Sequence, residues 1–423
     1  MLKLTEITPP MRYDAIVVGA GPSGCSCALF LARAGRRILL LDKAVFPREK
    51  VCGDAFSGKS IGIARELGLL DSLPSLPHGI VRGLTMVSPT GKKVNVPFPN
   101  AKGMEFAGYT IERRLVDNLF FQAALAEKGI TTIQGFAVDG LERTGDGAVC
   151  GVSGHRQSKD GKVPSRFNAK IVVGADGSAS TVNRLLHMKS PPMEHVYSAV
   201  RGYWSGISGL DDSIELYFID GVLPGYLWIF PMANGMANVG LGILSSDLKN
   251  RKHPTVTLTE AVAKHPSIAP RFANARLEGK IGGWAIPNGS YKKQNTGEGW
   301  VLIGDAASLV DPFSGEGVGN ALTSGKYAAM AINSALDAHN NDTYLPASSL
   351  KAYEEKVAAH LRPEMMNSYR IQRLSRIRFL LNLFIGKAAD KPDVRQMLVD
   401  MLGSTEEKKK VVSPTFYLKL LLP

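Results

Sequence analysis

The first residues that could do chemistry are three glycines close to the start of the chain. Gly19, Gly21 and Gly24 form a G-x-G-x-x-G pattern between an apolar stretch that begins at Tyr13 and a stretch with helical periodicity. The first glycine permits a sharp turn, the second lets the backbone approach a pyrophosphate, and the third lets helix and strand pack closely. The helix N-terminus then faces the phosphates, and Asp42, at the end of the next apolar stretch, can accept hydrogen bonds from ribose hydroxyls.

Two later motifs decide between the dinucleotides that use such a turn. Asp176 follows one apolar run in an Asp-Gly turn, and Asp305 ends another in a Gly-Asp pair. Gly315 and Gly317 come next, just before a helical pattern. The three motifs, in this order and spacing, resemble the p-hydroxybenzoate hydroxylase-like FAD superfamily over roughly residues 12 to 340. The resemblance implies an oxidoreductase that binds FAD.

The superfamily resemblance also implies which residues contact the cofactor. In similar proteins a carboxylate matching Asp305 accepts hydrogen bonds from ribityl hydroxyls, and backbone matching Gly317 and Val318 lies against the flavin ring. Arg113 matches an arginine that reaches the cofactor, and its neighbour Arg114 leaves a shift of one residue open. The expected cofactor-binding residues are Gly19, Gly21, Gly24, Cys25, Asp42, Cys52, Gly53, Arg113, Ala137, Asp176, Gly304, Asp305, Gly315, Gly317 and Val318.

Some of these positions allow a second interpretation. Cys25 stands beside the expected phosphates, where a small packed thiol would serve equally well, and Ala137 matches a position whose backbone approaches the adenine. Similar proteins often carry an arginine seven residues after the aspartate of the Asp-Gly turn, where this chain has Asn183 followed by Arg184. We therefore expect that turn to be held in a different way.

Two further segments resemble a narrower group of flavoproteins. The run from Tyr226 to Pro231 matches the Y-x-W-x-F-P signature of the geranylgeranyl reductase family. The run from Arg48 to Gly53 is similar to the R-x-K-x-C-G segment of the same family. The resemblance implies an enzyme that saturates isolated C=C bonds in prenyl chains of lipids or of chlorophyll side chains, with reduced FAD as the hydride source.

An alternating aromatic strand suits such a substrate. It could line a tunnel for an apolar chain, so the expected substrate contacts are Tyr226, Trp228, Phe230 and Pro231. The alternative is that the rings only fill the core between sheet and cofactor domain. Alkene reduction also needs a proton, and Cys52 is the candidate catalytic residue that donates it. Flavin N1, a bound water and Tyr226 are alternative donors. Cys52 could instead be a buried residue without a role in the reaction. The electron donor, NADPH or ferredoxin, stays open.

Two other kinds of flavoprotein compete with this interpretation. One is a monooxygenase or halogenase of the same fold, which would oxidise an aromatic substrate with oxygen. Halogenases commonly carry a G-x-W-x-x-I-P segment, whereas the run from Gly225 to Pro231 has its tryptophan one position later and lacks the Ile-Pro pair. This difference argues against a halogenase but not against a hydroxylase. The other competitor is a membrane-associated or binding flavoprotein in which FAD is structural.

These motifs need a framework of alternating strands and helices. The expected elements are strands over 13–19, 37–42, 131–134, 148–152 and 169–174 and helices over 22–34 and 115–128. The Gly- and Ser-rich stretch from Gly154 to Ser165 predicts an exposed hairpin loop. Between Val196 and Gly283 apolar and polar residues alternate, which favours an antiparallel sheet. From Leu350 the periodicity is helical, with breaks at prolines.

The expected fold class is therefore α/β: a Rossmann-like FAD-binding domain with an inserted antiparallel-sheet substrate domain and a C-terminal helical region. A chain of 423 residues is long for one hydrophobic core, which favours several domains. We assign segments 12–85, 106–190 and 285–340 to the FAD-binding domain. Segments 86–105 and 191–284 go to the substrate domain, and 341–423 to the helical region.

Composition and charge narrow the class of protein. With 44% hydrophobic and 21% charged residues, the chain has an ordinary globular composition. Its four cysteines, without a CxxC pair, predict neither a disulfide framework nor a zinc site. The sequence predicts neither a signal peptide nor a membrane span, so we expect a cytoplasmic location. No nucleic-acid motif accompanies the net charge of +12, so nucleic acid is not an expected partner.

The C-terminal region carries an excess of basic residues. They precede two apolar runs: Arg370, Arg373, Arg376 and Arg378 come before 379–385, and Lys408, Lys409 and Lys410 before 416–422. One interpretation is a helical cap packed on the substrate domain. The other is a peripheral contact with anionic lipid on the inner face of a membrane, where a prenyl lipid would reside. The oligomeric state stays open.

Overall fold

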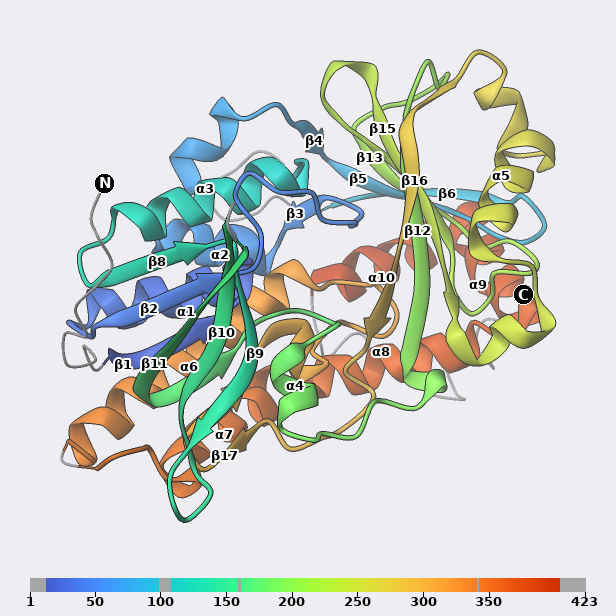
Figure 1. Cartoon of the computed structure of the whole chain (residues 1–423). Coiled ribbons are helices and arrows are strands. Elements are labelled where there is room, and N and C mark those ends of the chain that lie inside the picture. Colours follow the sequence, from blue (N-terminus) through green and yellow to red (C-terminus); the bar gives the residue numbers. More distant parts are fainter. Residues whose placement is uncertain (1–12, 99–107, 159–160, 341, 404–423) are drawn as a thin grey trace.

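A computed structural model describes residues 13–98, 108–158, 161–340 and 342–403 (Figure 1). Its first layer is an eight-stranded sheet whose central strands run parallel and are almost wholly apolar, as a sheet covered on both faces requires. In spatial order the strands are β17 (Thr296–Gly297), β18 (Trp300–Leu302), β11 (Gly161–Gly174), β1 (Tyr13–Val18), β2 (Ile38–Asp42) and β8 (Ile130–Gln134), with β10 (Val149–Ser158) on β11 and β9 (Phe136–Arg143) on β10.

Helices from distant parts of the sequence pack around this sheet. The pair α1 (Pro22–Arg33) and α6 (Val318–Ala338) lie side by side, with α3 (Arg113–Ala126) against α1 and α2 (Lys59–Glu66) against α6. The α1–α6 contact is close because Gly325 has no side chain: a Cβ there would lie 2.4 Å from the carbonyl oxygen of Ser23. This contact brings the N-terminal halves of α1 and α6 together.

A seven-stranded sheet forms the second layer, and Figure 1 shows it beside the first. Its order is β16 (Arg276–Pro287), β12 (Val196–Ser205), β15 (Ala237–Leu244), β14 (Leu227–Pro231), β13 (Ser213–Tyr217), β5 (Gly83–Val87) and β6 (Lys93–Pro97). Side chains on one face, such as Leu227 and Val239, pack with those of α5 (Pro254–Lys264). On the other face, α9 (Arg378–Asp390) and α10 (Pro392–Gly403) cover β5 and β6.

The remaining elements connect the two layers. A small sheet has the order β3 (Ala55–Ser57), β7 (Gly108–Thr110) and β4 (Gly79–Val81). The other helices are α4 (Thr181–Leu185), α7 (Lys351–His360) and α8 (Arg362–Leu374). β3 follows the segment that contains Cys52 and Gly53, which therefore lies where the chain passes between the layers.

The α/β fold class expected from the sequence is confirmed, and three details differ. Residues 154–165 are not a loop: most of them pair in β10 and β11. Gly154 is needed for packing, because a Cβ there would lie 2.3 Å from the Ala137 carbonyl oxygen of β9. The sequence analysis did not predict β9. The second sheet is also not wholly antiparallel, since β13 pairs with β5 in parallel. Helices α8 and α10 begin at the predicted proline breaks, and Pro414 lies outside the described residues.

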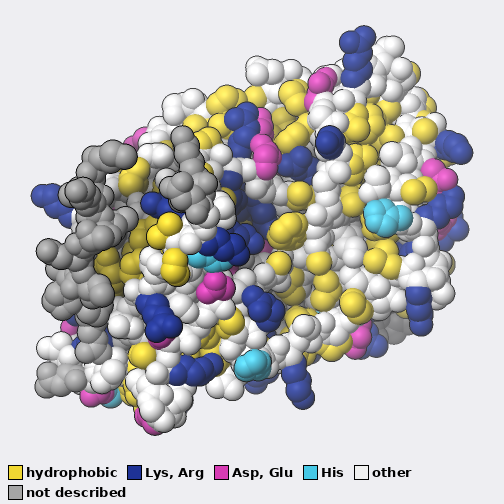
Figure 2. All heavy atoms as spheres, in the orientation of Figure 1, with side chains coloured by type: hydrophobic (Ala, Val, Ile, Leu, Met, Phe, Trp, Pro, Cys, Tyr) yellow, Lys and Arg dark blue, Asp and Glu magenta, His cyan; other side chains and the backbone are white. Residues whose placement is uncertain are grey.

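Lysine and arginine side chains are spread over the face seen in Figure 2, with acidic side chains between them. Among the helices that the structure describes, none combines the length and apolarity that crossing a bilayer demands. The runs 408–410 and 416–422 lie outside the described residues.

Candidate active site

The turn after β1 has no room for side chains. Gly19 adopts φ +104°, and a Cβ on Gly24 would lie 1.8 Å from the Gly19 carbonyl oxygen. Gly21 caps the N-terminus of α1, which has proline at its first position. The backbone amides at this end are thus free to face a phosphate, which fits the predicted dinucleotide.

Asp42 holds this turn and still offers oxygen lone pairs. Its Oδ2 accepts a hydrogen bond from the Ala20 amide at 2.8 Å, and its Oδ1 accepts one from the Ala44 amide at 2.8 Å. The carboxylate therefore stands at the end of β2 in a fixed orientation beside the glycine turn, where the sequence placed it. Cys25 is fully buried and its thiol donates to the Ala20 carbonyl at 3.1 Å, which supports the packed-thiol interpretation.

Two arginines converge on one buried carboxylate next to the turn. Arg113 forms a bidentate pair with Asp117, at 2.6 and 2.8 Å, and Arg48 Nη1 lies 3.1 Å from the same carboxylate. Arg48 also reaches Gly21, where a Cβ would be 3.3 Å from its Nη2. Two cations facing one anion leave net positive charge beside the amides of α1, as a pyrophosphate site needs. Arg114 instead pairs with Glu112, so of the two arginines Arg113 points inward.

Hydrogen bonds from several side chains hold the Asp-Gly turn after β11. Asp176 accepts hydrogen bonds from the Ser180 hydroxyl at 2.5 Å and the Val182 amide at 3.1 Å, so it caps α4. Asn183 donates to the Ala306 carbonyl at 2.7 Å, and the ammonium of Lys293 binds both that carbonyl and the Asn183 side chain. Lysine and asparagine thus tie this turn to the Gly304-Asp305 segment, while Arg184 is exposed.

Gly304 and Asp305 stand where α1 and α6 meet. Gly304 has φ +60°, and a Cβ there would lie 2.9 Å from the Ser23 hydroxyl of α1. In the part of the chain that the structure describes, no donor is hydrogen-bonded to the Asp305 carboxylate, whose Oδ1 is 3.8 Å from the point that a Cβ of Gly317 would occupy. The Asp305 carboxylate is half-buried and its oxygens accept no hydrogen bond from the described residues, so they could accept hydrogen bonds from ribityl hydroxyls. Val318 begins α6 at the same place.

The segment before α6 is anchored to the aromatic strand. Tyr226 donates a hydrogen bond to the Ser314 carbonyl at 2.5 Å, and a Cβ on Gly315 would lie 3.2 Å from the Tyr226 hydroxyl. Asp311 Oδ1 accepts from two backbone amides and the Ser314 hydroxyl, which fixes the bend. Tyr226 therefore connects the expected flavin end of the site with the seven-stranded sheet.

The two segments that resemble the geranylgeranyl reductase family meet in space. A Cβ on Gly53 would lie 3.1 Å from the Phe230 ring and 3.7 Å from Trp228 Nε1. Asn238 of β15 links them: it accepts a hydrogen bond from Trp228 Nε1 at 2.9 Å and donates one to the Cys52 carbonyl at 2.7 Å. Cys52 and the aromatic run therefore belong to one site.

The thiol of Cys52 is neutral in this setting. Burial raises its pKa, and the positive charge of the nearby Arg113 acts in the opposite direction. Lys50 lies close by, with Nζ 4.0 Å from the centre of the Trp284 ring. Burial lowers its pKa to about 8, although the charge of Asp305 favours the ammonium form.

Other predicted positions lie at the edges of this arrangement. Ala137 lies in β9, three residues after Gln134, which pairs with Asp42. Pro231 ends β14, and its carbonyl accepts a hydrogen bond from the Thr110 hydroxyl. Neither side chain makes a contact that assigns it a role.

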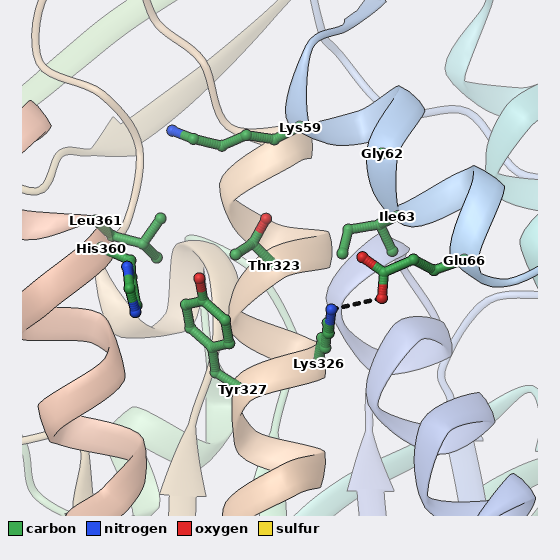
Figure 3. A pocket seen from close by; sticks show the side chains of 9 residues that line it. All are labelled: Lys59, Gly62, Ile63, Glu66, Thr323, Lys326, Tyr327, His360 and Leu361. Carbon is green, nitrogen blue, oxygen red and sulfur yellow. Dashed lines mark hydrogen bonds and ion pairs between the residues drawn. The ribbon is translucent and has the colours of Figure 1, made fainter. Parts of the chain in front are cut away.

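A hollow of about 250 Å³ lies elsewhere, between α2, α6 and the corner of α7 and α8 (Figure 3). Lys326, paired with Glu66, and Tyr327, whose ring centre is 5.7 Å from that of His360, stand at its wall. None of the residues predicted for cofactor or substrate lines it.

The sequence analysis did not single out several residues that contact the predicted positions, namely Asp117, Asn238 and Lys293. It also missed Asp54, which follows Gly53 and accepts hydrogen bonds from Asn238 and from Tyr203, each at 2.7 Å. Only one gave a signal: Asn238 is a polar residue inside the apolar run 237–244, and it is fully buried. The others depend on which distant strands become neighbours.

Comparison with known proteins agrees with this geometry. The FAD binding domain family matches residues 12–366. Menaquinone reductase of Mycobacterium tuberculosis is 32% identical over 76% of this chain and 76% of its own length. Digeranylgeranylglycerophospholipid reductase 1 of Methanococcoides burtonii is 31% identical over 75% of this chain and 73% of its own.

Solved structures show the same fold. A geranylgeranyl bacteriochlorophyll reductase-like protein from Thermoplasma acidophilum has a TM-score of 0.78 at 24% identity, covering 92% of this chain and 99% of that one. A flavin-dependent brominase has a TM-score of 0.75 at 20% identity, covering 93% and 94%. The chain belongs to the FAD-binding oxidoreductase family that includes the geranylgeranyl-type reductases.

Proposed function

We propose that this flavoprotein saturates C=C bonds in the prenyl chain of a lipid or related isoprenoid. The observation that carries the proposal is the contact of the Cys52-Gly53 turn with Trp228 and Phe230. Two relatives add support through their names, because menaquinone and a digeranylgeranyl glycerophospholipid share an isoprenoid chain. FAD, when bound, would supply the hydride.

The chain's own residues would hold FAD along one line of contacts. The amides at the N-terminus of α1 and the guanidinium of Arg48 would bind the pyrophosphate, with Asp42 at the ribose. Asp305 would accept from the ribityl hydroxyls, and the backbone at Gly317 would lie against the flavin. The line ends beside Cys52, since Arg113, which pairs with Asp117, also lies close enough for its charge to act on that thiol.

The aromatic row would receive the apolar chain. Ring centres of Phe313, Phe218, Tyr226, Trp228 and Phe230 follow one another at 6.1 to 6.3 Å. Two of these contacts are edge-to-face, one is stacked and one is tilted. The polar atoms of Tyr226 and Trp228 are already hydrogen-bonded, so the row offers apolar surface, which suits a hydrocarbon. Packing of the rings on the cofactor side alone is the competing explanation, and substrate binding distinguishes the two.

The proton that completes the reduction has a local source. Cys52 keeps its proton because burial raises the pKa of the thiol. A neutral thiol beside the guanidinium of Arg113 can donate a proton and leave a thiolate that the cation stabilises. We therefore assign the proton-donating role to Cys52 in this proposal.

An anaerobic reduction series tests the function. FAD-loaded protein is mixed with NADH, NADPH or reduced ferredoxin and with digeranylgeranyl glycerophospholipid or menaquinone. We expect mass spectrometry to show a gain of two hydrogens for each double bond reduced. Untouched prenyl substrates together with hydroxylation or halogenation of an aromatic in air would assign the protein to the other enzyme class. Flavin that no donor reduces would indicate a structural cofactor.

A membrane contact is a second part of the proposal. Leu381, Phe384 and Ile385 of α9 are buried against the substrate sheet, so that side of the predicted stripe is a packed cap. Ile377 and Phe379, however, are exposed by 49% and 61%. These two side chains lie among the exposed arginines Arg373, Arg376 and Arg378. Apolar and basic side chains exposed together are typical of a surface that binds anionic lipid.

A further inference from the structure

Asn238 is the only asparagine inside β15, and every polar atom of its side chain has a partner. Its residue is fully buried and lies between Tyr203 on β12 and Phe230 on β14. Its oxygen accepts from Trp228 Nε1, a group that can only donate, so its nitrogen must point the other way. There it donates to the Cys52 carbonyl and to Asp54 Oδ2, each at 2.7 Å.

Asp54 is the second member of this network. It is 1% exposed and has φ +66°, a left-handed conformation that a non-glycine residue adopts only when its surroundings hold it. Its Oδ2 accepts from the Tyr203 hydroxyl at 2.7 Å as well as from Asn238, and its backbone carbonyl accepts from the Ile111 amide. The bend after Cys52-Gly53 is thus fixed by two strands, β12 and β15, and by the residue that follows β7.

We propose that Asn238 and Asp54 are positioning residues that hold the Cys52-Gly53 turn and the Trp228 ring in one arrangement against the substrate chain. This inference rests on the proposed function, because it assigns the two residues a part in the same site. It goes further in naming residues that touch neither reacting atom but determine where Cys52 and Trp228 lie.

The chemistry of the contacts favours this role over simple packing. Apolar side chains could fill the same space without the cost of burying an amide and a carboxylate. Directional hydrogen bonds restrict position more tightly than apolar contact does, and this network joins groups that are 184 and 186 residues apart in sequence. Its effect is to fix the distance between the thiol and the aromatic row.

The reactivity of Cys52 measures the position of the turn without any substrate. In a Cys150→Ser background Cys52 is the one thiol that is not fully buried, since Cys25 and Cys27 are inaccessible. Alkylation of FAD-loaded protein by iodoacetamide should accelerate about tenfold in Asn238→Ala and in Asp54→Ala, because each loses buried hydrogen bonds to the turn. Asp54→Asn keeps an acceptor but, like Asp54→Ala, removes the charge that raises the pKa of the Cys52 thiol. It should therefore react more slowly than Asp54→Ala, and the difference between the two variants measures the lost hydrogen bonds.

Ser198→Ala is the matched control. Ser198 is on β12 of the same sheet, and its hydroxyl is hydrogen-bonded to that of Ser245. Loss of this bond should leave the alkylation rate unchanged. Should Asn238→Ala fail to fold, Trp228→Phe keeps one aromatic ring while it removes the indole donor and the second ring, and it should still accelerate alkylation. Equal rates in the parent and in the folded variants would overturn the inference.

Turnover completes the test. With the prenyl substrate that the parent reduces, Asn238→Ala should lower kcat about tenfold to a hundredfold while KM changes little, because a misplaced group affects the reaction more than binding. Normal kcat despite faster alkylation would overturn the positioning role. A parent that reduces no prenyl substrate but shows the alkylation pattern would refute the proposed function and leave the network as the holder of the turn.

Discussion

The Trp228 ring occupies the space beside Gly240, its partner on the neighbouring strand: a Cβ on Gly240 would be 2.4 Å from the indole ring. The same Cβ would be 2.3 Å from the Val200 carbonyl oxygen on the other side. The ring position therefore depends on the absence of a side chain at residue 240. Gly240 follows the aromatic run that ends at Pro231. This contact is a physical reason for a glycine at that position.

Gly240→Ala should displace Trp228 and lower the free energy of unfolding by about 1 to 3 kcal/mol, as overpacking does. Urea unfolding measures the loss, and prenyl reduction should fall with it. Gly386→Ala is the control, because nothing lies within 4 Å of a Cβ at that helical position. That change should be neutral or add about 0.4 to 1 kcal/mol. Similar stability of the two variants would contradict the packing argument.

Gly24→Ala should abolish FAD binding. Its Cβ would overlap the Gly19 carbonyl oxygen, so the turn must open and the amides of α1 must move. The purified parent should release FAD on heating, in a ratio near one per chain, and the variant should be colourless. Recovery of FMN from the parent would reject the cofactor assignment. Arg48→Gln, which removes one cation beside Gly21 and leaves the turn intact, should bind FAD about tenfold more weakly.

Much of the cofactor site could be predicted from sequence because it depends on local geometry. The Gly19 to Gly24 turn lies between consecutive elements, so its spacing alone indicates a phosphate-binding bend. The Asp54–Asn238 network could not be predicted in this way. Its members come from a turn and from β12 and β15, and only the pairing of those strands makes them neighbours. The prediction of a loop at residues 154–165 was wrong for a related reason. Gly154 allows a close contact between β10 and β9 and does not mark a bend.

The stability of the protein should depend on pH through Asp54. Burial raises the pKa of this carboxyl to about 6, although hydrogen bonds from Tyr203 and Asn238 and the charges of Arg201 and Arg113 oppose the shift. The native state therefore binds more protons than the unfolded state between about pH 4 and pH 6, so the free energy of unfolding falls as pH rises through that window.

Asp54→Asn removes this dependence. Relative to the variant, the parent should lose about 2 kcal/mol of unfolding free energy between about pH 4.5 and pH 7.5. Urea unfolding of both proteins at the two pH values checks it. A difference between them that stays constant with pH would show that Asp54 is ionised throughout.

Binding to anionic vesicles should depend on the edge around Ile377 and Phe379. Flotation with phosphatidylserine-containing liposomes should recover the parent, and neutral liposomes should not. Replacing Arg373, Arg376 and Arg378 with glutamine should weaken recovery, since each basic residue near the surface contributes about 1 kcal/mol. Arg376 and Arg378 also lie 3.1 and 3.4 Å from Asp247 and Asp220. The arginine side chain is exposed in both pairs, and ion pairs that solvent reaches contribute little to folding.

The control for this edge removes the same charge elsewhere. Lys162, Arg166 and Arg184 are exposed on β11 and α4, and their replacement with glutamine should leave flotation unchanged. Equal loss with both triple variants would indicate attraction to net charge alone. Recovery of the parent in the soluble fraction with either lipid would leave α9 as a packed cap only.

The contact between Gly53 and Phe230, together with the bond from Asn238 to the Cys52 carbonyl, also bears on how such proteins diverge. The Cys52-Gly53 turn and the aromatic strand pack directly against each other, so neither can change its shape without a change in the other. Among related sequences, residues 52–54 and 228–240 should therefore vary in step, as spatial neighbours do. A chimera that exchanges one segment without the other would join two surfaces that never fitted, whereas exchange of both would transfer a working pair.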